Sequence, residues 1–178
     1  MVKKNETTLK LAPGEVIMSR IINAPRELVF EAWTEAEHIE KWFGPRIFRT
    51  EAESDPRPGG AYRIAMIGNE KAPPEHSGPY PMKGLYKEFI KPEKVVFTQD
   101  LTDHPKDWKD LLQSKIKDYS GEDFLNTVTT VTFQDMGSQT KVTIITSFDS
   151  CGVRDAYISL GMKEGWAESL DKLEEMLS

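Results

Sequence analysis

The feature that most constrains the fold is a long amphipathic segment at the end of the chain, residues 153–177. Its apolar side chains recur at steps of three and four, the period of one helical face, and its charged side chains lie largely off that face. The apolar positions are Ile158, Met162, Trp166, Leu170, Leu173 and Leu177. A helix with one apolar face must bury that face against another layer. The rest of the chain therefore has to supply a large apolar partner.

The middle of the chain supplies this partner as β-strands. Segments of alternating or branched apolar residues are separated by turn signals rich in Gly, Pro, Asn and Asp. The predicted strands cover residues 15–23, 46–54, 60–68, 81–91, 94–101, 124–134 and 139–148. Short turns at 91–94 and 135–138 join neighbouring strands as hairpins, which predicts an antiparallel sheet.

Two short helices are predicted after the first strand. Pro25 suits a first helical turn, and apolar residues follow it at helical spacing. Thr34, with Glu37 three residues later, has the pattern of a capping box that would begin the second helix. Residues 1–14 are expected to be a polar N-terminal tail, and residues 15–178 a single domain. The predicted fold is α+β, a helix-grip in which a curved antiparallel sheet of six to seven strands wraps the long C-terminal helix.

Composition narrows the classes of function. A net charge of −6 and a pI of about 5.2 argue against nucleic acid as a partner. Cys151, the only cysteine, leaves no internal disulfide and fits a reducing compartment, so we expect a cytoplasmic location. No apolar run is long enough for membrane insertion, and the three histidines lack metal-ligand spacing. We therefore expect no metal and no cofactor.

Strand parity predicts which side chains face the long helix. On the strand 81–91 the lysines share one parity, so the other parity points inward. The same reasoning, with the helix stripes, gives a candidate ligand-binding set. Its members are Trp42, Tyr62, Ile64, Met66, Met82, Tyr86, Glu88, Phe97, Val131, Phe133, Met162 and Trp166. Such side chains either fill a solid core or line an open apolar cavity, and the methionines would adapt to ligands of different shape.

Glu88 is the charged member of this set. A carboxyl group on an inward face either pairs with a Tyr or Arg as part of the structure, or is poised to bond a ligand and exchange a proton. Glu88 and Tyr86 are accordingly the candidate catalytic residues. No Ser-His-Asp arrangement and no glycine-rich phosphate loop is evident in the sequence.

Six segments in order along the chain carry a family resemblance. They are 24–33 (APRELVFEAW), 41–45 (KWFGP), 55–63 (DxRxGGxYR), 84–88 (GxYxE), 92–98 (PEKVVFT) and 165–173 (GWxxxLxxL). Over about residues 15–177 the chain resembles the SRPBCC superfamily, which includes the START and birch-pollen-allergen-like proteins. Within it, the chain is similar to the family of heat shock protein 90 ATPase activator homologues. The resemblance implies a helix-grip fold with a cavity between sheet and helix.

Residues 102–122 are longer than the connection expected in that family. Trp108, Leu112, Ile116 and Tyr119 form a stripe that predicts a helix near residues 105–119. This helix could pack outside the sheet, pair with a second subunit or cover the cavity mouth, and we favour a lid because insertions at the open end of a sheet commonly gate sites.

Three hypotheses of function follow. The first is binding of a small hydrophobic or amphipathic molecule in the cavity. The second is an enzyme of the polyketide cyclase or hydrolase type, in which Glu88 and Tyr86 would supply acid-base catalysis. The third is a co-chaperone-like module that binds a protein partner, as the family name implies. We rank ligand binding first, the enzyme second and the co-chaperone third, because the inward apolar set and the superfamily resemblance both point to binding.

Overall fold

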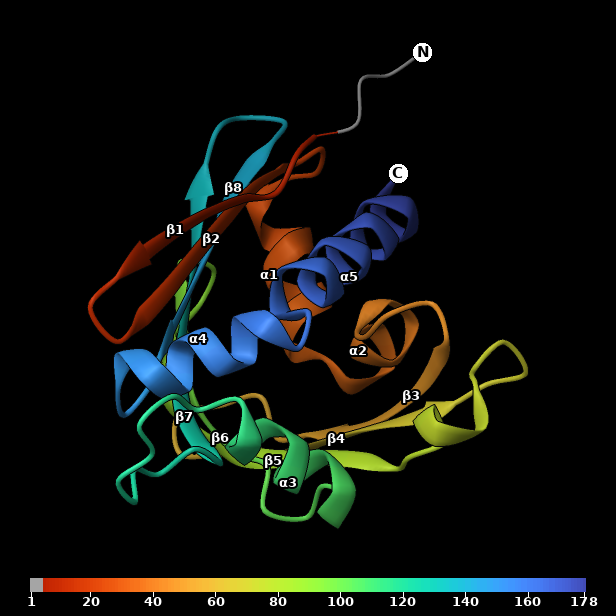
Figure 1. The fold of residues 1–178 in the computed structure, drawn as a ribbon. Helices are drawn as coiled ribbons and strands as arrows, with labels where there is room; N and C mark the ends of the chain where they lie inside the picture. The colour runs from red at the N-terminus through yellow and green to blue at the C-terminus, as the bar shows by residue number, and fades with distance from the viewer. Residues whose placement is uncertain (1–4) are drawn as a thin grey trace.

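The computed structural model describes residues 5–178, and in this part of the chain eight strands form one antiparallel sheet that curves around the helices (Figure 1). The strands are β1 (Thr8–Ala12), β2 (Glu15–Ile22), β3 (Phe48–Ser54), β4 (Ala61–Gly68), β5 (Tyr80–Ile90), β6 (Lys94–Asp100), β7 (Asn126–Asp135) and β8 (Thr140–Ser147). Their order is β1-β2-β8-β7-β6-β5-β4-β3. The helices are α1 (Arg26–Thr34), α2 (Ala36–Trp42), α3 (Lys106–Ser114), α4 (Cys151–Ser159) and α5 (Met162–Leu177), with a 3-10 turn at Pro74–His76.

The predicted helix-grip fold is confirmed. Each predicted strand is present, and the hairpins β5–β6 and β7–β8 form where the turns at 91–94 and 135–138 were expected. The additional strand is β1, which lies in the segment expected to be a polar tail. It pairs with β2 from Thr8↔Ser19 to Ala12↔Glu15, because β2 would otherwise expose the backbone groups of an unpaired edge. Residues 1–4 of the expected tail lie outside the described residues.

The predicted capping box at Thr34 is wrong. Thr34 is the last residue of α1, and its hydroxyl donates to the carbonyl of Phe30 at 3.0 Å instead of capping α2. The N-cap of α2 is Glu35, whose side chain makes no capping bond. Thr34 bonds backward to residue i−4 because a threonine hydroxyl can satisfy a carbonyl of its own helix as readily as a free N–H of the next.

The long C-terminal helix is also interrupted, contrary to the prediction. Gly161 has φ +91°, a left-handed conformation that ends α4 and forms the N-cap of α5. Glycine adopts this conformation without the steric cost that a side chain would add. Both helices still lie along the inner side of the sheet, and Leu170 and Leu173 of α5 are fully buried there.

The inner face of the sheet and the helices enclose an aromatic core. Phe30 of α1 packs edge-on against Phe133 of β7 and Phe89 of β5, with ring centroids 5.2 Å apart in both pairs. Arg20 reaches from β2 toward α5, where its guanidinium pairs with Asp171 at 2.6 Å. The same guanidinium pairs with Glu174 at 2.8 Å, so two carboxylates of α5 tie the helix to the buried Arg20 of the sheet.

The insertion forms α3, which is shorter than predicted. The helix ends at Ser114, and Asp118 has φ +54°, so the chain leaves helical geometry before the expected end at 119. Leu112 and Ile116 are buried as the stripe predicted. Tyr119 instead lies 40% exposed, its ring against that of Phe124.

Candidate functional site

An apolar chamber of about 160 Å³ lies between the inner face of the sheet and the C-terminal helices. Strands β4 to β8 supply its floor, and the junction of α4 and α5 supplies its roof. Its lining residues are Phe43, Ile64, Met66, Tyr80, Met82, Gln99, Leu101, His104, Thr127, Thr146, Phe148, Tyr157, Met162 and Trp166. The lining is mostly apolar with a few polar groups, which is the usual composition of a small-molecule site.

The inner end of this chamber is nearly closed by aromatic side chains. Only about 20 Å³ remains among Trp33, Trp42, Tyr62, Tyr86, Phe97 and their neighbours. Trp33 stacks on Trp166 at 5.9 Å and packs against Trp42 at 4.7 Å. These rings fill the space as a solid core, so the open volume lies on the other side of Trp166.

The outer end of the chamber widens into a mouth of about 240 Å³. The mouth lies between the loop Gly44–Pro45, the turn at Gly161, and Trp108 of α3. Trp108 packs on His104 at 4.4 Å and on Tyr157 of α4 at 6.3 Å, which holds α3 beside the opening. Figure 1 shows α3 next to α4, on the side of the molecule where β4, β5 and β6 run.

Gln99 of β6 lines the chamber, its inner end and its mouth. Its carbonyl oxygen accepts hydrogen bonds from the hydroxyls of Thr127, at 3.1 Å, and Thr129. Among residues 5–178 its amide nitrogen meets only the sulfur of Met82, at 3.0 Å. A thioether sulfur carries no proton and can only accept, and it accepts weakly. The N–H groups of the amide, rather than its oxygen, therefore point toward Met82 and the cavity.

His104 is the second polar group of interest, and it follows β6 directly. Its Nδ1 lies 2.9 Å from the carbonyl oxygen of Pro81. A carbonyl can only accept, so Nδ1 carries the proton and Nε2 presents a lone pair. Burial lowers the pKa of His104 to about 4, so the ring is neutral near neutral pH. Nε2 has no hydrogen-bond partner among residues 5–178.

Most of the predicted ligand-binding residues face the interior. Those that line the chamber or its inner end are Trp42, Tyr62, Ile64, Met66, Met82, Tyr86, Phe97, Met162 and Trp166. Val131 and Phe133 are fully buried but line none of these spaces, because the core around Phe30 fills the sheet at that end. The sequence alone could not separate solid core from cavity lining.

The predicted inward position of Glu88 is wrong. The pairing of β5 with β6 shifts between Tyr86 and Glu88, which is the signature of a β-bulge. Beyond the bulge the parity reverses, so Phe89 points into the core while the side chain of Glu88 is 50% exposed and pairs with Lys94 at 2.8 Å. Glu88 is therefore removed from the candidate catalytic and ligand-binding residues.

Tyr86 does point inward, but its hydroxyl is already bonded. It lies 2.9 Å from the hydroxyl of Ser54, which donates to the carbonyl of Thr34 at 2.7 Å. Burial raises the pKa of Tyr86, which keeps the phenol protonated. Tyr62 is held in the same way, because its hydroxyl donates to the carbonyl of Thr98 at 2.6 Å. Neither phenol is poised for acid-base work.

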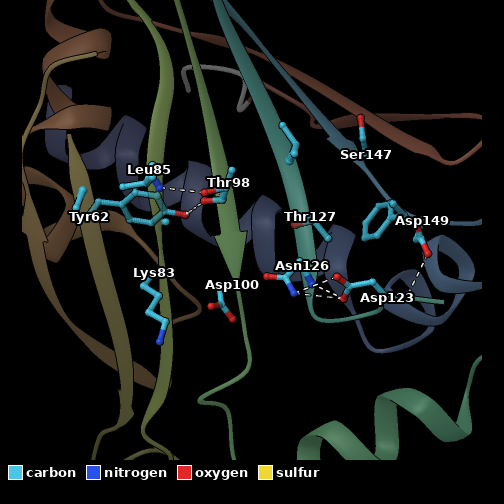
Figure 2. A pocket seen from close by; sticks show the side chains of 14 residues that line it. Tyr62, Lys83, Leu85, Thr98, Asp100, Asp123, Asn126, Thr127, Ser147 and Asp149 are labelled. Carbon is cyan, nitrogen blue, oxygen red and sulfur yellow. Dashed lines mark hydrogen bonds between the residues drawn. The ribbon is translucent and has the colours of Figure 1, made fainter. Parts of the chain in front are cut away.

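A wider hollow of about 760 Å³ lies on the other face of the sheet. Figure 2 shows it crossing β5, β6 and β7 with the helices behind the strands, and its exposed lining includes Lys83, Leu85 and Val128. Its polar groups already have partners: Lys83 pairs with Asp103 at 2.9 Å, and Asp123 accepts from Asn126 at 3.1 Å. This hollow is wide and open to solvent, and it is a weaker candidate site than the chamber.

Two further observations concern the residues described. Within residues 5–178, no three side chains among His, Cys, Asp and Glu gather as a metal-binding group. In the same part of the chain, no helix is long and apolar enough to cross a membrane.

Sequence reasoning missed Gln99 and His104. Gln99 shares the parity of Phe97 on β6, so the alternation that placed Phe97 inward could also have found Gln99. His104 lies in the connection between β6 and α3, where no periodicity exists to predict the direction of a side chain.

The curved sheet, the C-terminal helices and the cavity between them define a protein of the helix-grip class. A sequence model of the family described as "Activator of Hsp90 ATPase homolog 1-like protein" matches residues 23–178, and the chain belongs to this family.

Solved structures support the same fold. A protein from Rhodobacter sphaeroides is similar with a TM-score of 0.76 and 16% identity over 97% of each chain. A protein from Arthrobacter aurescens has a TM-score of 0.74 and 19% identity over 96% of this chain and 90% of its own. A protein from Nitrosomonas europaea has a TM-score of 0.70 and 24% identity over 92% and 93%. At these identities the likeness concerns the fold alone. No curated protein matches the chain in sequence.

Proposed function

We propose that the protein binds a small apolar or amphipathic molecule in the chamber between the sheet and the C-terminal helices. The observation that carries this proposal is the open volume of about 160 Å³ beside Trp166, lined by Met66, Met82 and Met162. A core that served only stability would be filled to the density of the aromatic cluster at its inner end. A cavity of roughly 150 Å³ is large enough to hold benzene, so the chamber suits a ligand about one ring in size.

The mouth gives such a ligand a way in. It widens to about 240 Å³ beside Gly161 and Gly165, two positions of the C-terminal helices without side chains. We propose that α3 acts as the lid of this mouth, with Trp108 as its contact across the opening. At the opening Trp108 is only partly buried, against Tyr157 and His104, while Leu112 anchors the helix in the core. A partly buried contact of this kind opens more easily than a fully buried one.

The other hypotheses gain no comparable support. The acid-base pair of the enzyme hypothesis is lost, because Glu88 lies on the outer face of the sheet. We also propose a cytoplasmic location, because the single cysteine, Cys151, is exposed as a free thiol.

A variant that blocks the mouth tests the binding proposal. A Cβ atom at Gly165 would lie 3.8 Å from Pro45, an ordinary contact, so Gly165→Ala should fold and leave the mouth open. Gly165→Leu adds three further carbon atoms at the edge of the opening. Binding of p-xylene is measured through the quenching of tryptophan fluorescence, in stopped flow. We expect p-xylene to enter the wild type and Gly165→Ala at the same rate and to enter Gly165→Leu at least tenfold more slowly. Equal entry rates in all three proteins, or no binding to the wild type, would contradict the proposal.

The lid is tested by kinetics rather than affinity. In Trp108→Ala, the release of p-xylene measured by stopped-flow fluorescence should be faster than in the wild type. Leu111, on the same helix, is 47% exposed, so Leu111→Ala is the matched control and should leave the rate unchanged. An unchanged release rate in Trp108→Ala would exclude the lid.

A further inference from the structure

Two residues that line the chamber carry a hydrogen-bond donor and a hydrogen-bond acceptor that the protein does not satisfy well. The donor is the side-chain amide of Gln99, whose N–H groups meet no described residue except Met82, at its sulfur. The acceptor is Nε2 of His104, which has no described partner. Both residues line the same space of about 160 Å³. In an apolar cavity such groups gain most from a ligand that pairs with them.

The amide of Gln99 is held in place from behind. Its carbonyl oxygen accepts from Thr127 and Thr129, and the hydroxyl of Thr129 lies 3.1 Å from that of Thr146. All three threonines are buried, so the network fixes both the side-chain rotamer and the direction of the amide. A fixed donor loses little freedom when a ligand binds, which favours the bound state.

The ring of His104 is held just as firmly. Nδ1 is bonded to the carbonyl of Pro81 at 2.9 Å, and the ring packs between Tyr80, at 5.6 Å, and Trp108, at 4.4 Å. The charged groups nearest to it are Lys109 and Asp103, which act on its protonation in opposite directions. The neutral ring therefore presents a lone pair of fixed direction.

We propose that these two residues select the ligand: the chamber takes an uncharged, ring-sized molecule that offers an oxygen acceptor to Gln99 and an O–H or N–H donor to His104. Phenols and ring alcohols have this chemistry. Carboxylates do not, because a carboxylate has no proton to give to Nε2, and no Lys or Arg of the described part of the chain lines the chamber to balance its charge. This inference rests on the proposed function and specifies the ligand class for the same site.

Three ligands of similar shape separate the contributions. p-Cresol has a donor and an acceptor, 4-methylanisole has an acceptor only, and p-xylene has neither. Because the cost of leaving water is a property of each ligand, it cancels when the affinity of one ligand is compared between two proteins. A neutral hydrogen bond corresponds to a change of about fivefold in affinity.

The variants remove one partner at a time. In Gln99→Leu, the affinities for 4-methylanisole and p-cresol should fall about fivefold relative to that for p-xylene. In His104→Phe, the affinity for p-cresol should fall about fivefold while those for 4-methylanisole and p-xylene change together. His104→Phe keeps an aromatic ring between Tyr80 and Trp108. If Gln99→Leu does not fold, Gln99→Glu takes its place, because its side chain keeps an oxygen that accepts from the threonines.

A measurement on the wild type alone makes the test independent of folding in the variants. The side-chain amide resonances of Gln99 should shift on addition of 4-methylanisole by more than on addition of p-xylene. Equal changes for the three ligands in every protein, or equal shifts in the wild type, would overturn the selection by Gln99 and His104 but leave the proposed function standing. Failure of all three ligands to bind the wild type would overturn both.

Discussion

The titration of His104 is the prediction that depends most closely on the geometry of the site. The pKa of His104 is lowered from 6.5 to about 4, first by burial and secondly by Lys109, while the bond to Pro81 and the charge of Asp103 act against the shift. The folded protein therefore keeps this ring neutral at a pH where the unfolded chain has already bound a proton. Since the unfolded state binds more protons, stability must fall as the pH drops from about 6.5 toward about 4.

The size of the effect follows from the same two pKa values. At ~1.4 kcal/mol per pKa unit, the difference corresponds to about 3 kcal/mol, nearly all of it present at neutral pH and lost progressively below pH 6.5. The perturbation is His104→Gln, which removes the titrating group and keeps a polar side chain. Urea unfolding followed by tryptophan fluorescence would give the free energy of unfolding of both proteins between about pH 7.5 and about pH 4.5.

We expect the stability advantage of the wild type over His104→Gln to shrink by about 2–3 kcal/mol across this range. Carboxyl groups titrate alike in both proteins, so their effect cancels in the comparison. His76 is exposed on the 3-10 turn, and His76→Gln is the matched control for the substitution itself. A difference between wild type and His104→Gln that stays constant with pH would refute the buried, neutral state of this ring.

Three further predictions concern stability and need only chemical denaturation. Phe89→Ala should lower the free energy of unfolding by about 2–4 kcal/mol, since the bulge turns Phe89 into the core, whereas Glu88→Ala should lower it by less than about 1 kcal/mol. A larger loss in Glu88→Ala than in Phe89→Ala would mean that Glu88 points inward and that the bulge is absent. Trp166→Ala should lower the free energy of unfolding by about 2 kcal/mol, because one side of Trp166 already faces open space. The usual loss for a fully enclosed ring is roughly 3–5 kcal/mol, and a loss in that range would argue against the cavity. Gly161→Ala should destabilise by about 1–2 kcal/mol because its φ is +91°, while Gly165→Ala within α5 should stabilise slightly; equal effects would contradict the break between α4 and α5.

The fold could be predicted from the sequence because each element carries its own periodicity. The alternation along residues 60–68 and 94–101 and the stripe from Met162 to Leu177 each fix one inner face, and a sheet and a helix with matching apolar faces have few ways to combine. The strand β1 escaped prediction because an edge strand with one side in water shows little alternation, and Leu11 is 51% exposed there.

The candidate site could be predicted only in part. Parity placed Tyr62, Met82 and Phe97 correctly, but it failed at Glu88, because a bulge adds one residue to one strand and no local pattern marked it. The break at Gly161 was equally hidden, since a glycine in a helical stripe looks the same whether or not it adopts a positive φ. His104 could not be found at all, because its place in the chamber is set by how the connection after β6 packs against Pro81 and Trp108.

The central claim, that the chamber holds a ring-sized ligand, is tested most directly by the methyl resonances of the methionines. Met66, Met82 and Met162 line the chamber, Met18 lies in the solid core, and Met136 is 45% exposed on the β7–β8 turn. In protein labelled with ¹³C at the methionine methyl groups, titration with p-cresol should shift the three chamber resonances along one saturable curve and leave those of Met18 and Met136 in place. Shifts at Met136 alone, or none at saturating p-cresol, would contradict the account.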